Sequence, residues 1–173
     1  MKPLTCSFWG LGLIGGSIAR ALKEAHPDML LRACDTHLPT LEAALQEGIV
    51  QEIYTDIDEV SGPVFCDSDY IFLCAPVSHN NSNLSRLKTY LREGCILTDV
   101  GSVKTPIHRL VEKEGLYSCF IGGHPMAGSE RIGFSNSKAS LLENAYYILT
   151  PSDGVSQEQT ERFTMLVRDM GAI

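Results

Sequence analysis

The chain has 173 residues and a mass of 19.0 kDa, which is the size of about one domain. Hydrophobic residues make up 44% and charged residues 20%, a composition that argues against an intrinsically disordered chain. The net charge of −7 repels phosphate backbones and anionic lipid, so we expect neither nucleic-acid binding nor membrane-surface binding. No apolar run approaches the ~20 residues that span a bilayer. The N-terminal residues lack a signal-peptide cleavage site, and we therefore expect a cytoplasmic protein.

Apolar, strand-like runs alternate with stretches of helical spacing along the chain. The expected strands are Leu4–Trp9, Leu30–Cys34, Tyr70–Cys74, Cys95–Val100, Phe120–Gly122 and Tyr146–Leu149. The expected helices are Leu13–Ala25, Thr40–Gln46, Asn83–Leu91, Pro106–Glu114 and Gln157–Met170. Strands and helices in alternation predict an α/β fold with a doubly wound, mainly parallel sheet, formed by residues 1–173 as a single domain. A long polar loop is expected from Gly122 to Asn144.

A glycine-rich turn follows the first strand and opens the first helix. It reads Gly10-Leu11-Gly12-Leu13-Ile14-Gly15. In a dinucleotide-binding turn of this spacing, the first glycine allows the sharp bend and the second leaves room for a pyrophosphate. The third lets the helix pack closely on the strand. Free N–H groups at the helix N-terminus attract the phosphates. We therefore expect these six residues to bind a dinucleotide in a Rossmann-like fold, the alternative being a glycine turn without a ligand.

An acidic residue, Asp35, ends the second strand twenty positions after Gly15. A carboxylate there would accept hydrogen bonds from the adenosine ribose hydroxyls, which favours NAD over NADP. His37 could partly compensate a 2′-phosphate when it is protonated, so NADP is less expected but remains open. Asp35 could instead cap the following helix.

The strand Tyr70–Cys74 ends in a small residue and a proline, Ala75 and Pro76. Ligands of doubly wound sheets lie over the carboxyl ends of the strands. We therefore expect Ala75 and Pro76 to leave room beside the ribose and nicotinamide. The alternative is a strand that simply stops at the proline.

Two later segments are dense in polar and small residues, and each begins at the carboxyl end of an expected strand. One carries the pattern D-x-G-S-x-K at 99–104, and the other reads H-P-M-A-G-S-E at 124–130. Together with the glycine-rich turn they resemble the prephenate dehydrogenase family, which includes arogenate and cyclohexadienyl dehydrogenases. The resemblance covers essentially the whole chain.

The resemblance implies an NAD-dependent oxidative decarboxylation of prephenate to 4-hydroxyphenylpyruvate, in tyrosine biosynthesis. It places the catalytic histidine at His124, which would accept the proton of the C4 hydroxyl group, and an orienting serine at Ser102. It also implies that Ser129 and Glu130 line the substrate pocket. Outside the resemblance, His124 could be a capping or buried structural residue, Ser102 a helix N-cap and Glu130 a solvated acid.

A histidine suits the proton transfer that accompanies oxidation of an alcohol, whatever the family of the protein. Hydride departure leaves developing positive charge on the alcohol carbon, and a neutral imidazole can remove the hydroxyl proton. An ordinary imidazole pKa of about 6.5 suits a base at neutral pH. Hydride transfer needs no metal, and neither the histidines nor the cysteines have convincing metal-ligand spacing. We expect the cysteines to be buried free thiols.

Family members continue with a helical C-terminal domain that mediates dimerisation and supplies basic groups for the substrate carboxylates. We expect these 173 residues not to include that domain, and we therefore expect cofactor binding but weak turnover, and a homodimer only for the intact protein. The substrate could be prephenate or arogenate. Another dinucleotide-dependent dehydrogenase and a non-catalytic NAD-binding module are the remaining alternatives.

Overall fold

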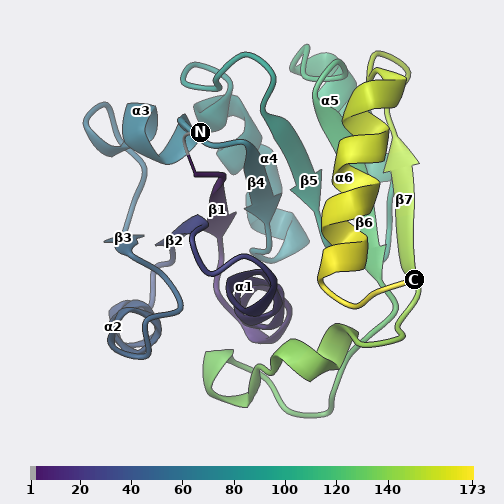
Figure 1. The fold of residues 1–173 in the computed structure, drawn as a ribbon. Helices are drawn as coiled ribbons and strands as arrows, with labels where there is room; N and C mark the ends of the chain where they lie inside the picture. The colour runs from purple at the N-terminus through teal and green to yellow at the C-terminus, as the bar shows by residue number, and fades with distance from the viewer. Residues whose placement is uncertain (1–2) are drawn as a thin grey trace.

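The computed structural model describes residues 3–173, except for the side chains of residues 77–81. Its centre is a seven-stranded sheet in the order β3-β2-β1-β4-β5-β6-β7 (Figure 1). The strands are β1 Thr5–Trp9, β2 Leu30–Cys34, β3 Glu52–Tyr54, β4 Tyr70–Leu73, β5 Ile96–Asp99, β6 Phe120–Pro125 and β7 Tyr147–Pro151. Only β7 runs antiparallel to its neighbour. The expected α/β fold with a doubly wound, mainly parallel sheet is therefore confirmed.

Helices cover both faces of the sheet. They are α1 Leu13–Ala25, α2 Leu38–Gln46, α3 Ser61–Cys66, α4 Val77–Leu87, α5 Thr105–Lys113 and α6 Gln157–Asp169. Buried side chains of α1, α2 and α6 form one hydrophobic cluster with the sheet, and those of α3, α4 and α5 form a second cluster on the other face. The six parallel strands, β1 to β6, have their carboxyl ends at the same edge of the sheet, and the candidate site residues lie at that edge.

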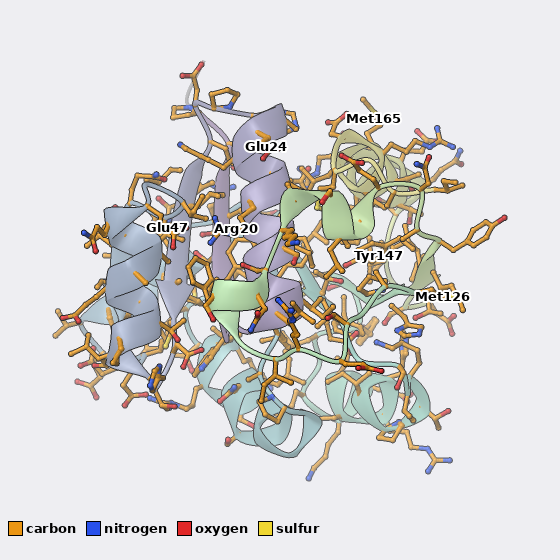
Figure 2. The ribbon with its side chains drawn as sticks, turned by 90° about the horizontal axis from the view of Figure 1, so that it is seen from below. Arg20, Glu24, Glu47, Met126, Tyr147 and Met165 are labelled. Carbon is orange, nitrogen blue, oxygen red and sulfur yellow. The ribbon has the colours of Figure 1, made fainter. Side chains whose placement is uncertain are left out.

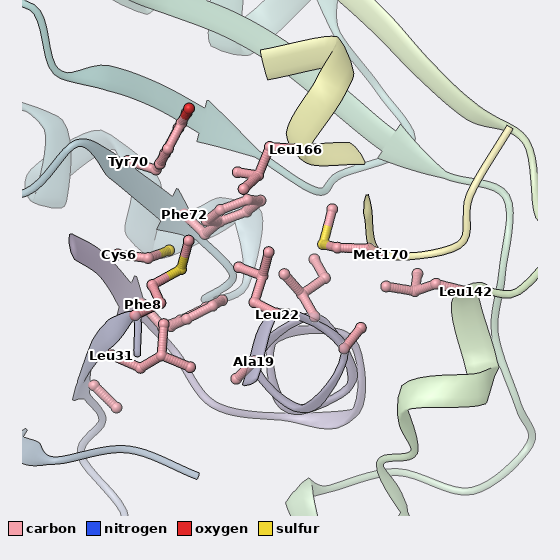
Figure 3. Close-up of a cluster of buried hydrophobic side chains, with 14 of the residues drawn as sticks. Cys6, Phe8, Ala19, Leu22, Leu31, Tyr70, Phe72, Leu142, Leu166 and Met170 are labelled. Atoms are coloured by element: carbon pink, nitrogen blue, oxygen red, sulfur yellow. The ribbon is translucent and has the colours of Figure 1, made fainter. Parts of the chain in front are cut away.

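The core under α1 depends on close packing between the helix and the two central strands. The rings of Phe8 on β1 and Phe72 on β4 stack with centroids 5.3 Å apart. Figure 3 shows Ala19 and Leu22 of α1 facing this pair across the cluster. Full burial of a leucine or phenylalanine side chain stabilises a fold by about 1.5–3 kcal/mol, so this layer holds α1 firmly on the sheet.

Three differences from the sequence-based expectation concern short or polar segments. The structure adds β3 and α3, which the sequence analysis did not predict. Helix α4 begins at Val77, six residues before the expected start at Asn83, because Pro76 occupies the N-cap position. The expected loop from Gly122 to Asn144 contains the end of β6 and two 3-10 helices, η1 Phe134–Asn136 and η2 Ala139–Leu142.

The segment with η1 and η2 is fastened to α1 rather than free. Gly16 allows this contact, since a Cβ atom there would lie 2.8 Å from both the Phe134 ring and the Ser137 hydroxyl. Arg20 donates from Nε to Ser137 Oγ at 2.8 Å, and its guanidinium group lies 4.6 Å from the centroid of the Phe134 ring. It also pairs with Glu47 beyond the end of α2 at 2.6 Å (Figure 2). The first helix therefore anchors the segment that follows the H-P-M-A-G-S-E motif.

The C-terminal residues run beside the start of β7. Ile173 donates its N–H to Ala145 O at 2.8 Å, and Tyr147 donates its N–H to Ile173 O at 2.9 Å. Met126 and Ile148, in or next to the same pair of strands, are exposed apolar residues, as is Ile173 itself. An apolar surface therefore borders the carboxyl end of β6. Among the described residues, none of the helices is both long enough and apolar enough to cross a membrane.

Candidate active site

The three glycines of the first turn occupy three different environments. Gly10 has φ = +94°, and a Cβ atom there would lie 2.5 Å from the backbone nitrogen of Ala75. Gly12 is the N-cap of α1 with φ = −82°, and no atom lies within 4 Å of a Cβ built on it. A Cβ atom on Gly15 would lie 2.7 Å from the carbonyl oxygen of Gly10. The geometry fits a sharp turn at Gly10, an open approach at Gly12 and close helix packing at Gly15.

The other residues of this turn contribute through the backbone. The Leu11 side chain is fully buried, so only its backbone faces the turn. Leu13 and Ile14 are the first helical residues of α1 and are half-buried. The first N–H groups of a helix have no acceptor within it, so the N–H groups of Leu13 and Ile14 suit an anion at this end of α1.

Asp35 links the end of β2 to the glycine turn. Its Oδ2 accepts the Leu11 N–H at 2.8 Å, and its Oδ1 accepts the His37 N–H at 2.9 Å. The N-cap of α2 is His37, and no side chain caps that helix, so a capping role for Asp35 is wrong. Each carboxylate oxygen keeps a further lone pair, which leaves acceptors for hydroxyl groups beside the turn.

Ala75 and Pro76 follow β4 on the other side of the turn. The backbone of Ala75 lies against Gly10, as the 2.5 Å spacing to a built Cβ shows. Pro76 is exposed and is the N-cap of α4, so the chain enters a helix at once instead of ending in a simple loop. The glycine turn and the end of β4 thus form one continuous surface.

Ser102 lies in the loop between β5 and α5 and is exposed. Helix α5 begins at Thr105 with Lys104 at the N-cap position, without a side-chain capping bond. A helix-capping role for Ser102 is therefore wrong. The preceding residue, Gly101, donates its N–H to Asp99 Oδ2 at 3.1 Å.

His124 lies near the end of β6, where it pairs with Ile148 of β7. The residue is half-buried, and its position inside a strand excludes a capping role. Its Nδ1 atom is buried and has no hydrogen-bond partner among the described residues, so no bond joins it to Ser102. A buried polar atom without a partner costs about 1–3 kcal/mol. Such an atom is unusual enough in a native structure to mark a candidate functional residue.

Ser129 and Glu130 are exposed on the segment that follows β6. Ser129 Oγ accepts the N–H of Arg131 at 3.1 Å. Among the described residues, neither Ser129 nor Glu130 donates to or accepts from Nδ1 of His124. Their role in a substrate pocket stays a prediction.

Two charged residues of the site, Asp99 and Lys104, belong to the D-x-G-S-x-K motif, and the sequence analysis predicts no role for them. Asp99 is almost fully buried at the end of β5, and the ammonium group of Lys104 lies 2.5 Å from both of its carboxylate oxygens. Burial lowers the pKa of Lys104 from its ordinary value, and the bond to Asp99 opposes that shift. The sequence signal for this pair is the motif itself, because Asp99 and Lys104 are the first and last residues of D-x-G-S-x-K.

Tyr147 is a second buried polar residue beside the strand of His124. Its ring lies against Gly123, and its hydroxyl group has no hydrogen-bond partner among the described residues. Burial raises the pKa of Tyr147 well above its ordinary value, with smaller contributions from nearby groups that include Cys74 and Asp99.

We expect Tyr147→Phe to leave the fold as stable as before or to stabilise it by up to about 1 kcal/mol, because an unpaired hydroxyl group is removed from the core. Thermal unfolding of the two proteins measures the difference. A clear loss of stability would show instead that the hydroxyl group bonds to an internal water molecule.

The fold and these residues together define a nucleotide-binding domain of the Rossmann type. Within the described side chains, no group of three or more His, Cys, Asp or Glu could hold a metal ion. The model of the family "Prephenate dehydrogenase, nucleotide-binding domain" matches residues 18–173. The chain therefore belongs to this family.

Curated relatives and solved structures agree with the family assignment. A prephenate dehydrogenase of Lactococcus lactis subsp. cremoris is 38% identical over 155 residues, which are 88% of this chain and 41% of the relative. A prephenate dehydrogenase of Bacillus subtilis is 33% identical over 166 residues, which are 94% of this chain and 43% of the relative. The chain thus spans less than half the length of these relatives.

Solved structures of related enzymes resemble this chain over nearly its whole length. A prephenate dehydrogenase from A. aeolicus, in complex with hydroxyphenyl propionate and NAD+, has a TM-score of 0.90 and 28% identity, covering 100% of this chain and 59% of that one. A Synechocystis arogenate dehydrogenase has a TM-score of 0.88 and 32% identity, covering 98% of this chain and 58% of that one.

Proposed function

We propose that this chain is the NAD-binding and proton-accepting part of a dehydrogenase that converts prephenate to 4-hydroxyphenylpyruvate by oxidative decarboxylation. The observation that carries the proposal is the buried, unpartnered Nδ1 of His124 at the carboxyl edge of the sheet. This edge also holds the open glycine turn and the loop of Ser102. The solved relative that binds NAD+ and a hydroxyphenyl compound supports it.

The residues of the first turn fit a dinucleotide. Gly12 leaves open space at the N-terminus of α1, where backbone N–H groups meet a phosphate. The Asp35 carboxylate can accept ribose hydroxyl groups, and its negative charge disfavours a 2′-phosphate. When bound, the nicotinamide accepts the hydride.

His124 would act as the base. Nδ1 is buried, so Nε2 would be the nitrogen through which the ring meets a substrate hydroxyl group. Nε2 would accept the proton of that hydroxyl group while the hydride leaves the same carbon, and Ser102 would orient the hydroxyl group by a hydrogen bond. Loss of CO2 then restores aromaticity, so the protein mainly has to position and polarise the substrate.

The cofactor choice is tested by calorimetric titration of the chain with NAD+ and, separately, with NADP+. We expect NAD+ to bind more tightly than NADP+, and Asp35→Ala to weaken NAD+ binding at least tenfold, or about 1.4 kcal/mol. The variant loses the ribose acceptor and the partner of the Leu11 N–H. Glu42→Gln, which removes one charge from the exposed face of α2, serves as the control. Equal affinity of the Asp35 variant and the wild type would contradict the assignment.

The substrate is tested by following NADH formation with the chain in excess over prephenate or arogenate. We propose that prephenate is the faster substrate. Faster oxidation of arogenate would move the assignment to an arogenate dehydrogenase, an alternative that the Synechocystis relative supports. If NAD+ binds and neither compound is oxidised, the chain acts as a nucleotide-binding module only. A cytoplasmic location and a homodimer of the intact protein remain predictions.

A further inference from the structure

The last part of β6 lacks a strand partner on the side of β5. The β5–β6 pairing ends at Thr98 and Ile121, while β6 continues to Pro125 against β7. Gly123 directly precedes His124. On the side that faces β5, its backbone is hydrogen-bonded to the side chains of Asp99 and Lys104. Its N–H donates to Asp99 Oδ1 at 3.2 Å, and its carbonyl oxygen accepts from Lys104 Nζ at 2.7 Å. One ion pair therefore replaces the backbone ladder beside the candidate base.

The same ion pair also holds the loop of Ser102. Asp99 Oδ2 accepts the Gly101 N–H at 3.1 Å, directly before Ser102. Two residues after Ser102, Lys104 donates to Asp99 and to Gly123. The backbone on both sides of Ser102 is thus tied to the backbone that carries His124.

The two glycines of β6 make this arrangement possible. A Cβ atom on Gly123 would lie 2.6 Å from the carbonyl oxygen of Asp99, and one on Gly122 would lie 2.4 Å from Thr150 Oγ1 and 3.1 Å from Lys104 Cδ. A side chain at Gly122 would press on the Lys104 side chain, and one at Gly123 would push the backbone of Asp99 away from the strand.

We infer that the Asp99–Lys104 pair positions His124 and Ser102 relative to each other, by clamping Gly123 of β6 to the loop 100–104. This role rests on the proposed function of His124 as the base. Stability alone does not explain the pair, because a buried ion pair often contributes no more to folding than apolar residues of the same volume. Asp99 and Lys104 are positioning residues, since neither needs to touch the substrate.

The test compares Lys104→Met with a matched control elsewhere in the sheet. The control is Arg32→Met, which breaks the Arg32–Glu52 pair between β2 and β3, also with a mostly buried cation. Nuclear magnetic resonance spectra report the backbone amide of Gly123 and the ring of His124 directly. We expect Lys104→Met to shift or broaden both signals, whereas Arg32→Met leaves them in place even if it lowers the stability.

Binding and kinetics supply the second readout. With Lys104→Met we expect NAD+ affinity within about twofold of the wild type, because the glycine turn is not part of the clamp. We expect kcat for substrate oxidation to fall at least tenfold. KM for the substrate should change little. If Lys104→Met fails to fold, Asp99→Asn carries the test, because it keeps the side-chain volume and removes the ion pair.

Unchanged His124 and Gly123 signals in a folded Lys104→Met or Asp99→Asn variant would overturn the inference. So would a rate loss in Arg32→Met equal to that in Lys104→Met. The resonance and NAD+ measurements do not need turnover, so a wild-type chain without activity would contradict the proposed function and leave the clamp itself testable.

Discussion

Gly10→Ala is expected to destabilise the fold by about 3 kcal/mol or more. The new Cβ atom would lie 2.5 Å from the backbone nitrogen and 2.9 Å from the Cα of Ala75, which cannot move without shifting the end of β4. The residue would also have to keep φ = +94°. Backbone strain and overpacking each cost about 1–3 kcal/mol. For a chain of this length we therefore expect Tm to fall by roughly 10 °C, measured by circular dichroism.

The matched control is Gly12→Ala in the same turn. Gly12 has an ordinary φ of −82° and open space around a built Cβ, so the loss of stability should stay within about 1 kcal/mol, the usual scale of an N-cap change. NAD+ affinity should fall at least tenfold, because the methyl group occupies the approach of the pyrophosphate. Equal Tm losses in the two variants would contradict the separation of a folding role at Gly10 from a binding role at Gly12.

His124→Asn is expected to lower the rate of prephenate oxidation by about 10²–10⁴-fold, the usual contribution of a general base. Asparagine has a similar size but does not accept the hydroxyl proton. NAD+ affinity should stay within about twofold, and stability should not fall, because the buried Nδ1 of His124 makes no hydrogen bond among the described residues. Rapid-mixing measurements of NADH formation under single-turnover conditions give the rate.

The control histidine is His26, which pairs with Asp169 on the surface, away from the carboxyl edge of the sheet. His26→Asn should leave the rate within about twofold of the wild type. A folded His124→Asn variant that keeps most of its activity would show that another group accepts the proton, and the proposed role of His124 would then be wrong.

Local patterns were sufficient for most of the fold. The runs Leu30–Cys34 and Leu13–Ala25 form β2 and α1 with the expected bounds, because both are long enough to show a clear apolar pattern. Strand β3 has only three half-buried residues, so it carries no readable alternation. Helix α3 contains Gly62 and Pro63, which favour a turn on local propensity, and Phe65 and Cys66 make it a helix by packing into the core.

Some features of the candidate site could likewise be predicted from the sequence, and others could not. Gly10 and Gly12 could be identified from spacing, since the chemistry of a dinucleotide turn constrains neighbouring residues in the chain. Ser102 and His124 could be identified from motifs. The bond from Asp35 to the Leu11 N–H could not, and neither could the contact of Lys104 with Gly123, because each depends on how distant segments pack.

The class of fold, the glycine turn and the family could be predicted from the amino-acid sequence, because they depend on periodicity and on residues close together in the chain. Two contacts became visible only in the folded chain: Arg20 holds the segment after the motif against α1, and the Asp99–Lys104 pair holds Gly123 where the β5–β6 ladder ends. Those contacts form when segments far apart in the chain become neighbours at one edge of the sheet, and no local pattern encodes such distances.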